Sequence, residues 1–210
     1  LGSLIRFDRE QYTWKSDSSQ FLRHGKLRWA SNLFHIGVLG IFGGHLTGFL
    51  TPVAVWHAIG VSLPEKQMTA MVAGGVFGTM CTVGLAMLLT RRLRDPRIRA
   101  SSGPMDLLVL FLLLAQVILG LAGIPISAQH PDGLEMLKFM QWAQRIWTFR
   151  GGAAELVADV SIVFKLHMVL GLTVFLVFPF TRLVHIWSGF ASVLYLLRPY
   201  QLMRSRGAGR

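Results

Sequence analysis

Four histidines fall within apolar stretches of the sequence, where an imidazole is not expected without a function. They are His35, His45, His167 and His185. Polar side chains at membrane depth are costly, and they usually face a protein interior where they bind a cofactor, an ion or a proton. Polar connecting segments hold the other three histidines, His24, His57 and His130. We interpret those three as ordinary surface residues.

The elements that carry the four histidines are apolar windows long enough to cross a membrane. The windows cover about residues 31–54, 68–90, 105–127 and 161–187. Each can span about 30 Å of hydrocarbon as a helix. The chain has 210 residues, of which 52% are hydrophobic. We therefore predict an all-α membrane protein with four transmembrane helices in an antiparallel bundle. A soluble helical bundle is the alternative.

The rest of the chain is too small for a second domain, so we predict a single membrane domain over residues 1–210. A polar arm covers residues 1–30 and a polar tail covers residues 188–210. The connection before the fourth window contains GLEMLKFMQWAQRIW, a mixture of large apolar and charged residues that suits a short helix at the membrane interface. Asp132 and Glu135 resemble a capping box at its start.

The cysteine content excludes several classes of site. Cys81 is the single cysteine, and it lies in the second window. A disulfide framework, a cysteine-rich zinc or iron–sulfur ligand set, and a C-x-x-C-H haem attachment each need at least two cysteines, so the sequence excludes all of them. We expect Cys81 to be a small packing residue.

The basic residues indicate the orientation of the chain. The net charge is +11, and the lysines and arginines gather before the first window, in RRLRDPRIRASSGP between the second and third windows, and after the fourth. By the positive-inside rule, these segments and both termini are cytoplasmic. Nucleic-acid binding is disfavoured because the charge is spread over segments that flank the membrane.

Helical geometry places the four histidines at two depths. His167 and His185 are about five turns and 27 Å apart, so they share one face of the fourth window apart from a bend at Pro179. His35 and His45 are about 15 Å apart on the first window, which runs in the opposite direction. The predicted pairs are His45 with His167 toward the outside and His35 with His185 toward the inside.

Two imidazoles from facing helices at one depth can fill both axial positions of a haem iron. Two such pairs predict two b haems between the first and fourth helices. Glycines of the first window leave room for a flat porphyrin or, alternatively, allow close helix packing: Gly37, Gly40, Gly43, Gly44 and Gly48. Zinc is disfavoured because neither depth offers a third ligand. A proton relay is the main competing interpretation.

A haem with both axial positions occupied carries single electrons and binds no substrate at iron. Two haems at different depths predict electron transfer across the membrane, with membrane quinol as the natural donor. Lys66, the only cation between the first two windows, could hydrogen-bond a quinone oxygen or be an interfacial lysine. Arg182, one turn before His185, could pair with a haem propionate or mark the inner end of its helix.

Five segments resemble the gamma subunit, a dihaem cytochrome b, of the respiratory nitrate reductase family. They are SNLFHIGVLGIFGGH, PEKQMTAMVAGG, PISAQHPDG, FKLHMVLG and FPFTRLVHIWS. The similarity extends from about residue 4 to residue 206. It implies a subunit of the cytoplasmic membrane that oxidises quinol near the periplasmic face. Electrons would pass through two b haems to an iron–sulfur beta subunit and a molybdenum alpha subunit, which reduces nitrate. The chain alone would reduce no nitrate.

The resemblance also implies roles for individual residues. His45 and His167 would ligate the distal haem, and His35 and His185 the proximal haem. Lys66 and Gly48 would bind quinol, and Arg182 is a weaker candidate for a haem propionate.

The family usually has a further first transmembrane helix upstream of a segment such as LGSLIRFDREQYTW. We expect this helix to have been truncated or lost, with both haem sites retained because it carries no haem ligand. Two other functions stay open at this point. One is a dihaem cytochrome b subunit of a different quinone-linked oxidoreductase. The other is a transporter or proton channel with buried histidines.

Overall fold

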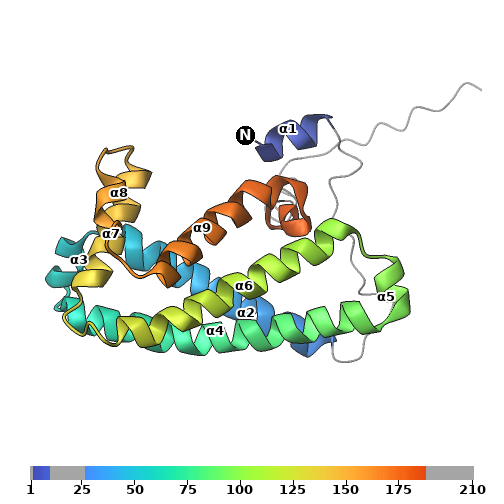
Figure 1. The fold of residues 1–210 in the computed structure, drawn as a ribbon, viewed down its shortest axis with the longest axis horizontal. Coiled ribbons are helices and arrows are strands. Elements are labelled where there is room, and N and C mark those ends of the chain that lie inside the picture. The colour runs from blue at the N-terminus through green and yellow to red at the C-terminus, as the bar shows by residue number, and fades with distance from the viewer. Residues whose placement is uncertain (1, 10–26, 188–210) are drawn as a thin grey trace, which may run out of the picture. The chain divides into compact units, whose positions relative to one another are not determined.

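The computed structural model describes residues 2–9 and 27–187, and its described part is helical without strands (Figure 1). Residues 10–26 of the predicted arm and the whole predicted tail, 188–210, lie outside the described residues. Four helical segments are long and apolar enough to cross a membrane: Leu27–Leu50, Leu63–Arg94, Pro104–Ser127 and Ile162–Phe180. The predicted all-α membrane fold with four spans is confirmed.

The chain divides into two compact units, one formed by Ser18–Val177 and the other by Leu1–Asp17 with Phe178–Arg210. The larger unit contains the helices α2 (Leu27–Leu50), α3 (Val53–Ala58), α4 (Leu63–Arg94), α5 (Pro96–Ala100), α6 (Pro104–Ser127), α7 (Leu134–Trp147), α8 (Ala153–Leu156) and α9 (Ile162–Val177). Within it, α2 packs on α4, α4 on α6, and α6 on α9, while α7 contacts α2 and α4. The antiparallel helices α4 and α6 are joined through α5 (Figure 1).

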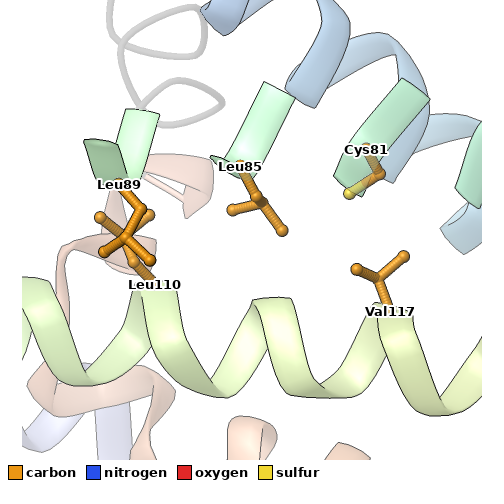
Figure 2. Close-up of a cluster of buried hydrophobic side chains, with 5 residues drawn as sticks. All are labelled: Cys81, Leu85, Leu89, Leu110 and Val117. Carbon is orange, nitrogen blue, oxygen red and sulfur yellow. The ribbon is translucent and has the colours of Figure 1, made fainter. Parts of the chain in front are cut away.

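The core between α4 and α6 is a row of facing apolar side chains (Figure 2). Cys81, Leu85 and Leu89 project from α4 toward Leu110 and Val117 on α6. Cys81 is 3% exposed. It therefore acts as a small packing residue, as we expected from its place in an apolar span.

Two glycines allow the backbones of α2 and α4 to touch. A Cβ on Gly37 would lie 2.5 Å from the backbone nitrogen of Cys81, and a Cβ on Gly84 would lie 2.4 Å from that of Phe34. Real Cβ atoms do not approach so closely, so neither position has room for a side chain. The two helices therefore cross in direct backbone contact, as small residues permit in membrane bundles.

A capping box sets the start of α4. The Ser62 backbone N–H donates to Glu65 Oε2 at 2.8 Å, and the Glu65 N–H donates to Ser62 Oγ at 3.5 Å. Pro64 in the first turn suits a helix start, because backbone N–H groups at this position have no acceptor within the helix and proline therefore loses no hydrogen bond. Because α4 begins at Leu63 rather than near residue 68, Lys66 lies in the helix and not in a connecting loop.

The end of α2 is fixed by its sequence and by a contact from α7. Thr51 precedes Pro52, and a residue before proline is disfavoured in helical conformation, so α2 ends at Leu50 instead of near residue 54. Gln144 Nε2 on α7 donates to the carbonyls of Phe49 at 2.9 Å and Thr51 at 3.3 Å. These bonds satisfy carbonyl groups that a helix end leaves without partners.

The predicted interfacial helix is present as α7, but its predicted capping box is wrong. Gly133 occupies the N-cap position with a φ of 77°, in the left-handed region that glycine adopts readily. Asp132 Oδ1 accepts the N–H of Leu134 at 3.1 Å. Glu135 instead lies 3.8 Å from Nδ1 of His130.

The fourth predicted helix is shorter than the window 161–187. α9 ends at Val177, and the 3-10 turns η2 (Phe178–Phe180) and η3 (Arg182–Val184) follow. Pro179 causes this change because it lacks an N–H and clashes with the preceding turn. In the smaller unit, α1 (Gly2–Arg9) packs against η2, and Arg6 Nη1 donates to the Pro179 carbonyl.

Candidate functional site

The rings of His45 on α2 and His167 on α9 lie close to each other. Their centroids are 6.1 Å apart and their planes differ by 38°. The structure thus brings together the two outer histidines that helical geometry places at one depth.

Hydrogen bonds fix which nitrogen of each ring is available. His45 Nδ1 lies 2.8 Å from the carbonyl of Ile41, and His167 Nδ1 lies 3.0 Å from the carbonyl of Gln116. A carbonyl can only accept, so both Nδ1 atoms carry the proton. Each Nε2 then keeps a lone pair, which is the form in which histidine binds a metal.

The separation of the two rings suits a shared metal ion. Two metal–nitrogen bonds of about 2 Å, with about 1.2 Å from each nitrogen to its ring centre, would place the centres of two rings on one metal ion about 6.4 Å apart. The observed 6.1 Å agrees with this value. The residues present therefore fit a group that takes one imidazole on each side.

His35 and His185, the pair predicted toward the inside, have the same local arrangement. His35 Nδ1 lies 2.7 Å from the Ser31 carbonyl, and His185 Nδ1 lies 2.7 Å from the Arg182 carbonyl. Because a carbonyl can only accept, Nδ1 carries the proton in these two rings as well. His35 belongs to the larger unit and His185 to the smaller one. Their pairing stays a prediction, as does the role of the Arg182 side chain.

The glycines of α2 divide into two groups. A Cβ on Gly37 or Gly40 would collide with α4, at 2.5 Å from the Cys81 nitrogen and 2.5 Å from the Phe77 ring respectively. These two serve helix packing. A Cβ on Gly43 or Gly44 would meet nothing within 4 Å. Packing within the described residues therefore does not require glycine at these two positions, next to His45.

Lys66 and Gly48 lie together. A Cβ on Gly48 would be 3.9 Å from Lys66 Nζ, and Gly48 follows His45 by one turn of α2. Lys66 is 5% exposed, and its Nζ lies 5.4 Å from the centre of the Trp56 ring, within cation–π range. Within residues 2–9 and 27–187, Nζ makes no hydrogen bond or ion pair.

The neighbour of Lys66 anchors this end of α4. Gln67 is 1% exposed, and its Nε2 donates to the carbonyls of Ser127 at 2.8 Å and His130 at 2.9 Å. These bonds tie the first turn of α4 to the end of α6. They position Lys66 without involving its side chain.

Sequence reasoning missed two residues of this region. Trp56 on α3 borders Lys66, and its Nε1 is buried without a hydrogen-bond partner among the described residues. Gln116 on α6 contacts His167. Trp56 has no sequence signal beyond its type, whereas Gln116 was visible as a single amide within an apolar span.

Comparison with known proteins decides the family. A family model described as the nitrate reductase gamma subunit matches residues 1–206. The chain belongs to the nitrate reductase gamma subunit family. It is 53% identical over 209 residues to the respiratory nitrate reductase 2 gamma chain of Escherichia coli (strain K12), covering 98% of this chain and 90% of that relative.

Two further relatives cover the same length. The respiratory nitrate reductase 1 gamma chain of the same strain is 52% identical over 206 residues, with 98% of this chain and 90% of the relative covered. The nitrate reductase gamma chain of Bacillus subtilis (strain 168) is 37% identical over 205 residues, covering 98% and 91%. This family member is a multi-pass membrane subunit of a nitrate reductase, an oxidoreductase complex.

Proposed function

We propose that this gamma subunit oxidises quinol near the outer face of the cytoplasmic membrane and delivers the electrons to cytoplasmic partner subunits. Those partners would be an iron–sulfur beta subunit and a molybdenum alpha subunit that reduces nitrate. The proximity of the His45 and His167 imidazoles, whose ring centroids are 6.1 Å apart, is the observation that carries the proposal. Membership of the nitrate reductase gamma subunit family supports it.

His45 and His167 would hold one b haem toward the outside, and His35 and His185 a second toward the inside. A b haem held by two imidazoles exchanges single electrons and has no free position for substrate. The protein contributes the ligand geometry. In all four residues a backbone carbonyl lies within hydrogen-bond distance of Nδ1 and holds the ring, and in His45 and His167 this leaves Nε2 for the metal.

Lys66 and Gly48 would form part of the quinol site. A buried ammonium group without a partner is unfavourable, and a quinol oxygen would supply the missing acceptor. The absent side chain at Gly48 leaves space within 3.9 Å of Lys66 Nζ. Since Gly48 follows His45 by one helical turn, a quinol held there would lie close to the outer pair.

Haem content and quinol reduction of the purified complex test the proposal. We expect two b haems per chain, both reduced on addition of quinol. His167→Leu should remove the outer haem and block quinol oxidation. His35→Leu should remove the inner haem and leave quinol reduction of the outer one possible.

The matched control is His130→Ala, because the His130 side chain is 54% exposed and should affect neither haem. A complex without haem, or a His167→Leu variant that quinol reduces at the full rate, would contradict the proposal. A colourless protein would favour a transporter or proton channel instead.

A further inference from the structure

An amide inside the most apolar span has no role in the function proposed above. Gln116 lies on α6, whose mean hydropathy of 2.8 is the highest of the four candidate spans. Its Oε1 is buried and has no hydrogen-bond partner in the described part of the chain. An unsatisfied amide at membrane depth is costly, and such groups usually serve a function. Packing alone does not account for it.

Gln116 contacts both nitrogens of the His167 ring. Its backbone carbonyl lies 3.0 Å from His167 Nδ1, and its side-chain Nε2 lies 3.4 Å from His167 Nε2. The first contact is a hydrogen bond that fixes the tautomer of the ring. The second is long for a hydrogen bond and places the amide beside the nitrogen that would bind iron. One residue thus defines the orientation and the surroundings of this imidazole.

Two glycines shape the space that the ring and the amide occupy. A Cβ on Gly120, one turn along α6, would lie 3.1 Å from His167 Cε1. A Cβ on Gly171, one turn along α9, would lie 3.0 Å from Gln116 Nε2. Both distances are tighter than ordinary contacts, so a side chain at either position would displace its neighbour. The two helices therefore leave a slot that fits the imidazole and the amide together.

From this arrangement we propose that Gln116 is a positioning residue that orients His167 and raises the reduction potential of the outer haem. The inference rests on the proposed function, in which His167 ligates that haem. The N–H end of the amide dipole lies beside His167 Nε2 and carries a partial positive charge. A positive charge near the iron disfavours the oxidised state, which has one more positive charge than the reduced state.

Potentiometric titration of the intact membrane complex tests the inference. Gln116→Met removes the amide while nearly keeping its length and volume. We expect both haems to remain, the outer haem to have a lower midpoint potential and an altered low-spin electron paramagnetic resonance signal, and the inner haem to keep its own values. Thr173→Val is the matched control on α9, because among the described residues the Thr173 hydroxyl donates to the Val169 carbonyl, at 2.8 Å, and contacts neither histidine.

A second variant keeps the amide and changes its place. Gly171→Ala should push the Gln116 side chain and alter the same outer signal. Gly74→Ala is its control, because a Cβ there would meet nothing within 4 Å. If Gln116→Met loses the outer haem, Gly171→Ala tests whether the Gln116 amide affects the outer haem.

Unchanged outer potential and spectrum in the variants that retain both haems would overturn the inference. A rise in the outer potential of Gln116→Met, or a shift confined to the inner haem in either variant, would also overturn it. Failure of the proposed function is distinguishable, because the wild-type complex would then lack two quinol-reducible haems.

Discussion

Nη1 of Arg92 lies 2.9 Å from Oδ2 of Asp106, and this ion pair joins the end of α4 to the first turn of α6. Their side chains are only 9% and 17% exposed. Asp106 Oδ2 also accepts the N–H of Gly103 at 3.2 Å. The arginine-rich turn between the two helices is therefore closed by a mostly buried charge pair, and part of its basic character is structural.

Removing one partner of this pair should destabilise the protein strongly. Asp106→Asn leaves the Arg92 guanidinium buried without its counter-charge, at a cost of about 3–5 kcal/mol. Thermal unfolding in detergent would measure the loss. Asp159→Asn is the control, because the Lys138–Asp159 pair is exposed and solvent screens such pairs, so its loss should matter far less. Equal losses in the two variants would show that the Arg92 pair does not hold the turn.

Side chains at the crossing of α2 and α4 should not be tolerated. Gly37→Ala and Gly84→Ala each place a Cβ within 2.5 Å of backbone nitrogen, which cannot move aside as a side chain can. We expect losses of about 1–3 kcal/mol or more from overpacking. Thermal unfolding and yield of assembled complex are the measurements. Gly74→Ala should be neutral or stabilising, since alanine favours helix and its Cβ has open space. A Gly37→Ala protein as stable as Gly74→Ala would contradict the backbone contact.

Lys66→Ala should weaken quinol binding while both haems remain. Hydrogen bonds to charged groups contribute about 1.5–3 kcal/mol, so the apparent KM for quinol should rise about 10- to 100-fold. Steady-state quinol oxidation, with haem content measured in parallel, tests this. Lys138→Ala is the control because that amine is bound to exposed Asp159 at 2.6 Å. Loss of a haem in Lys66→Ala would indicate that the lysine is structural.

Gly48→Ala separates the shape of the quinol site from its charge. The added Cβ would sit 3.9 Å from Lys66 Nζ, an ordinary contact, so protein stability should not change. The methyl group would instead fill space that we assign to quinol, and KM should rise with Lys66 intact. Unfolding temperature and quinol kinetics on the same preparation distinguish the two effects. An unchanged KM would place the quinol elsewhere.

The contact between Lys138 and Asp159 should depend on pH. The hydrogen bond from Lys138 lowers the pKa of Asp159 below its ordinary value. A carboxyl with a lowered pKa in the folded state stabilises the protein above its unfolded pKa of about 3.9, and this stabilisation is lost as pH falls through the folded value. The difference in unfolding temperature between wild type and Asp159→Asn should therefore be present at neutral pH and vanish in acid. A difference that persists below that range would point to another cause.

Hydropathy and length sufficed to predict the four membrane spans, because about 20 apolar residues in a row have few other stable locations. Counting residues along antiparallel helices also sufficed to predict that His45 and His167 meet. Both inferences use only the helical rise and the direction of the chain. They need no knowledge of how each helix is rotated.

The rotation of each helix about its own axis could not be predicted from the sequence. α6 is apolar on nearly all sides, so its periodicity does not reveal that Gln116 faces α9 and His167. For the same reason, the sequence does not reveal which glycines of α2 pack against α4 and which have open space beside them. Local chemistry also shifted boundaries: the capping box at Ser62 drew Lys66 into α4, and Pro179 ended the fourth helix early.

At Gly37 and Gly84 the backbones of α2 and α4 are in direct contact, so the two helices form one packed unit. His45 and Gly48 belong to α2 and Lys66 to α4, so direct contact between the two helix backbones, without intervening side chains, sets the spacing of the helix segments that carry them. Electron exchange falls steeply with separation. In the proposed function, the distance between a quinol at Lys66 and a haem at His45 would therefore depend on a helix crossing that has no side chains between its two backbones.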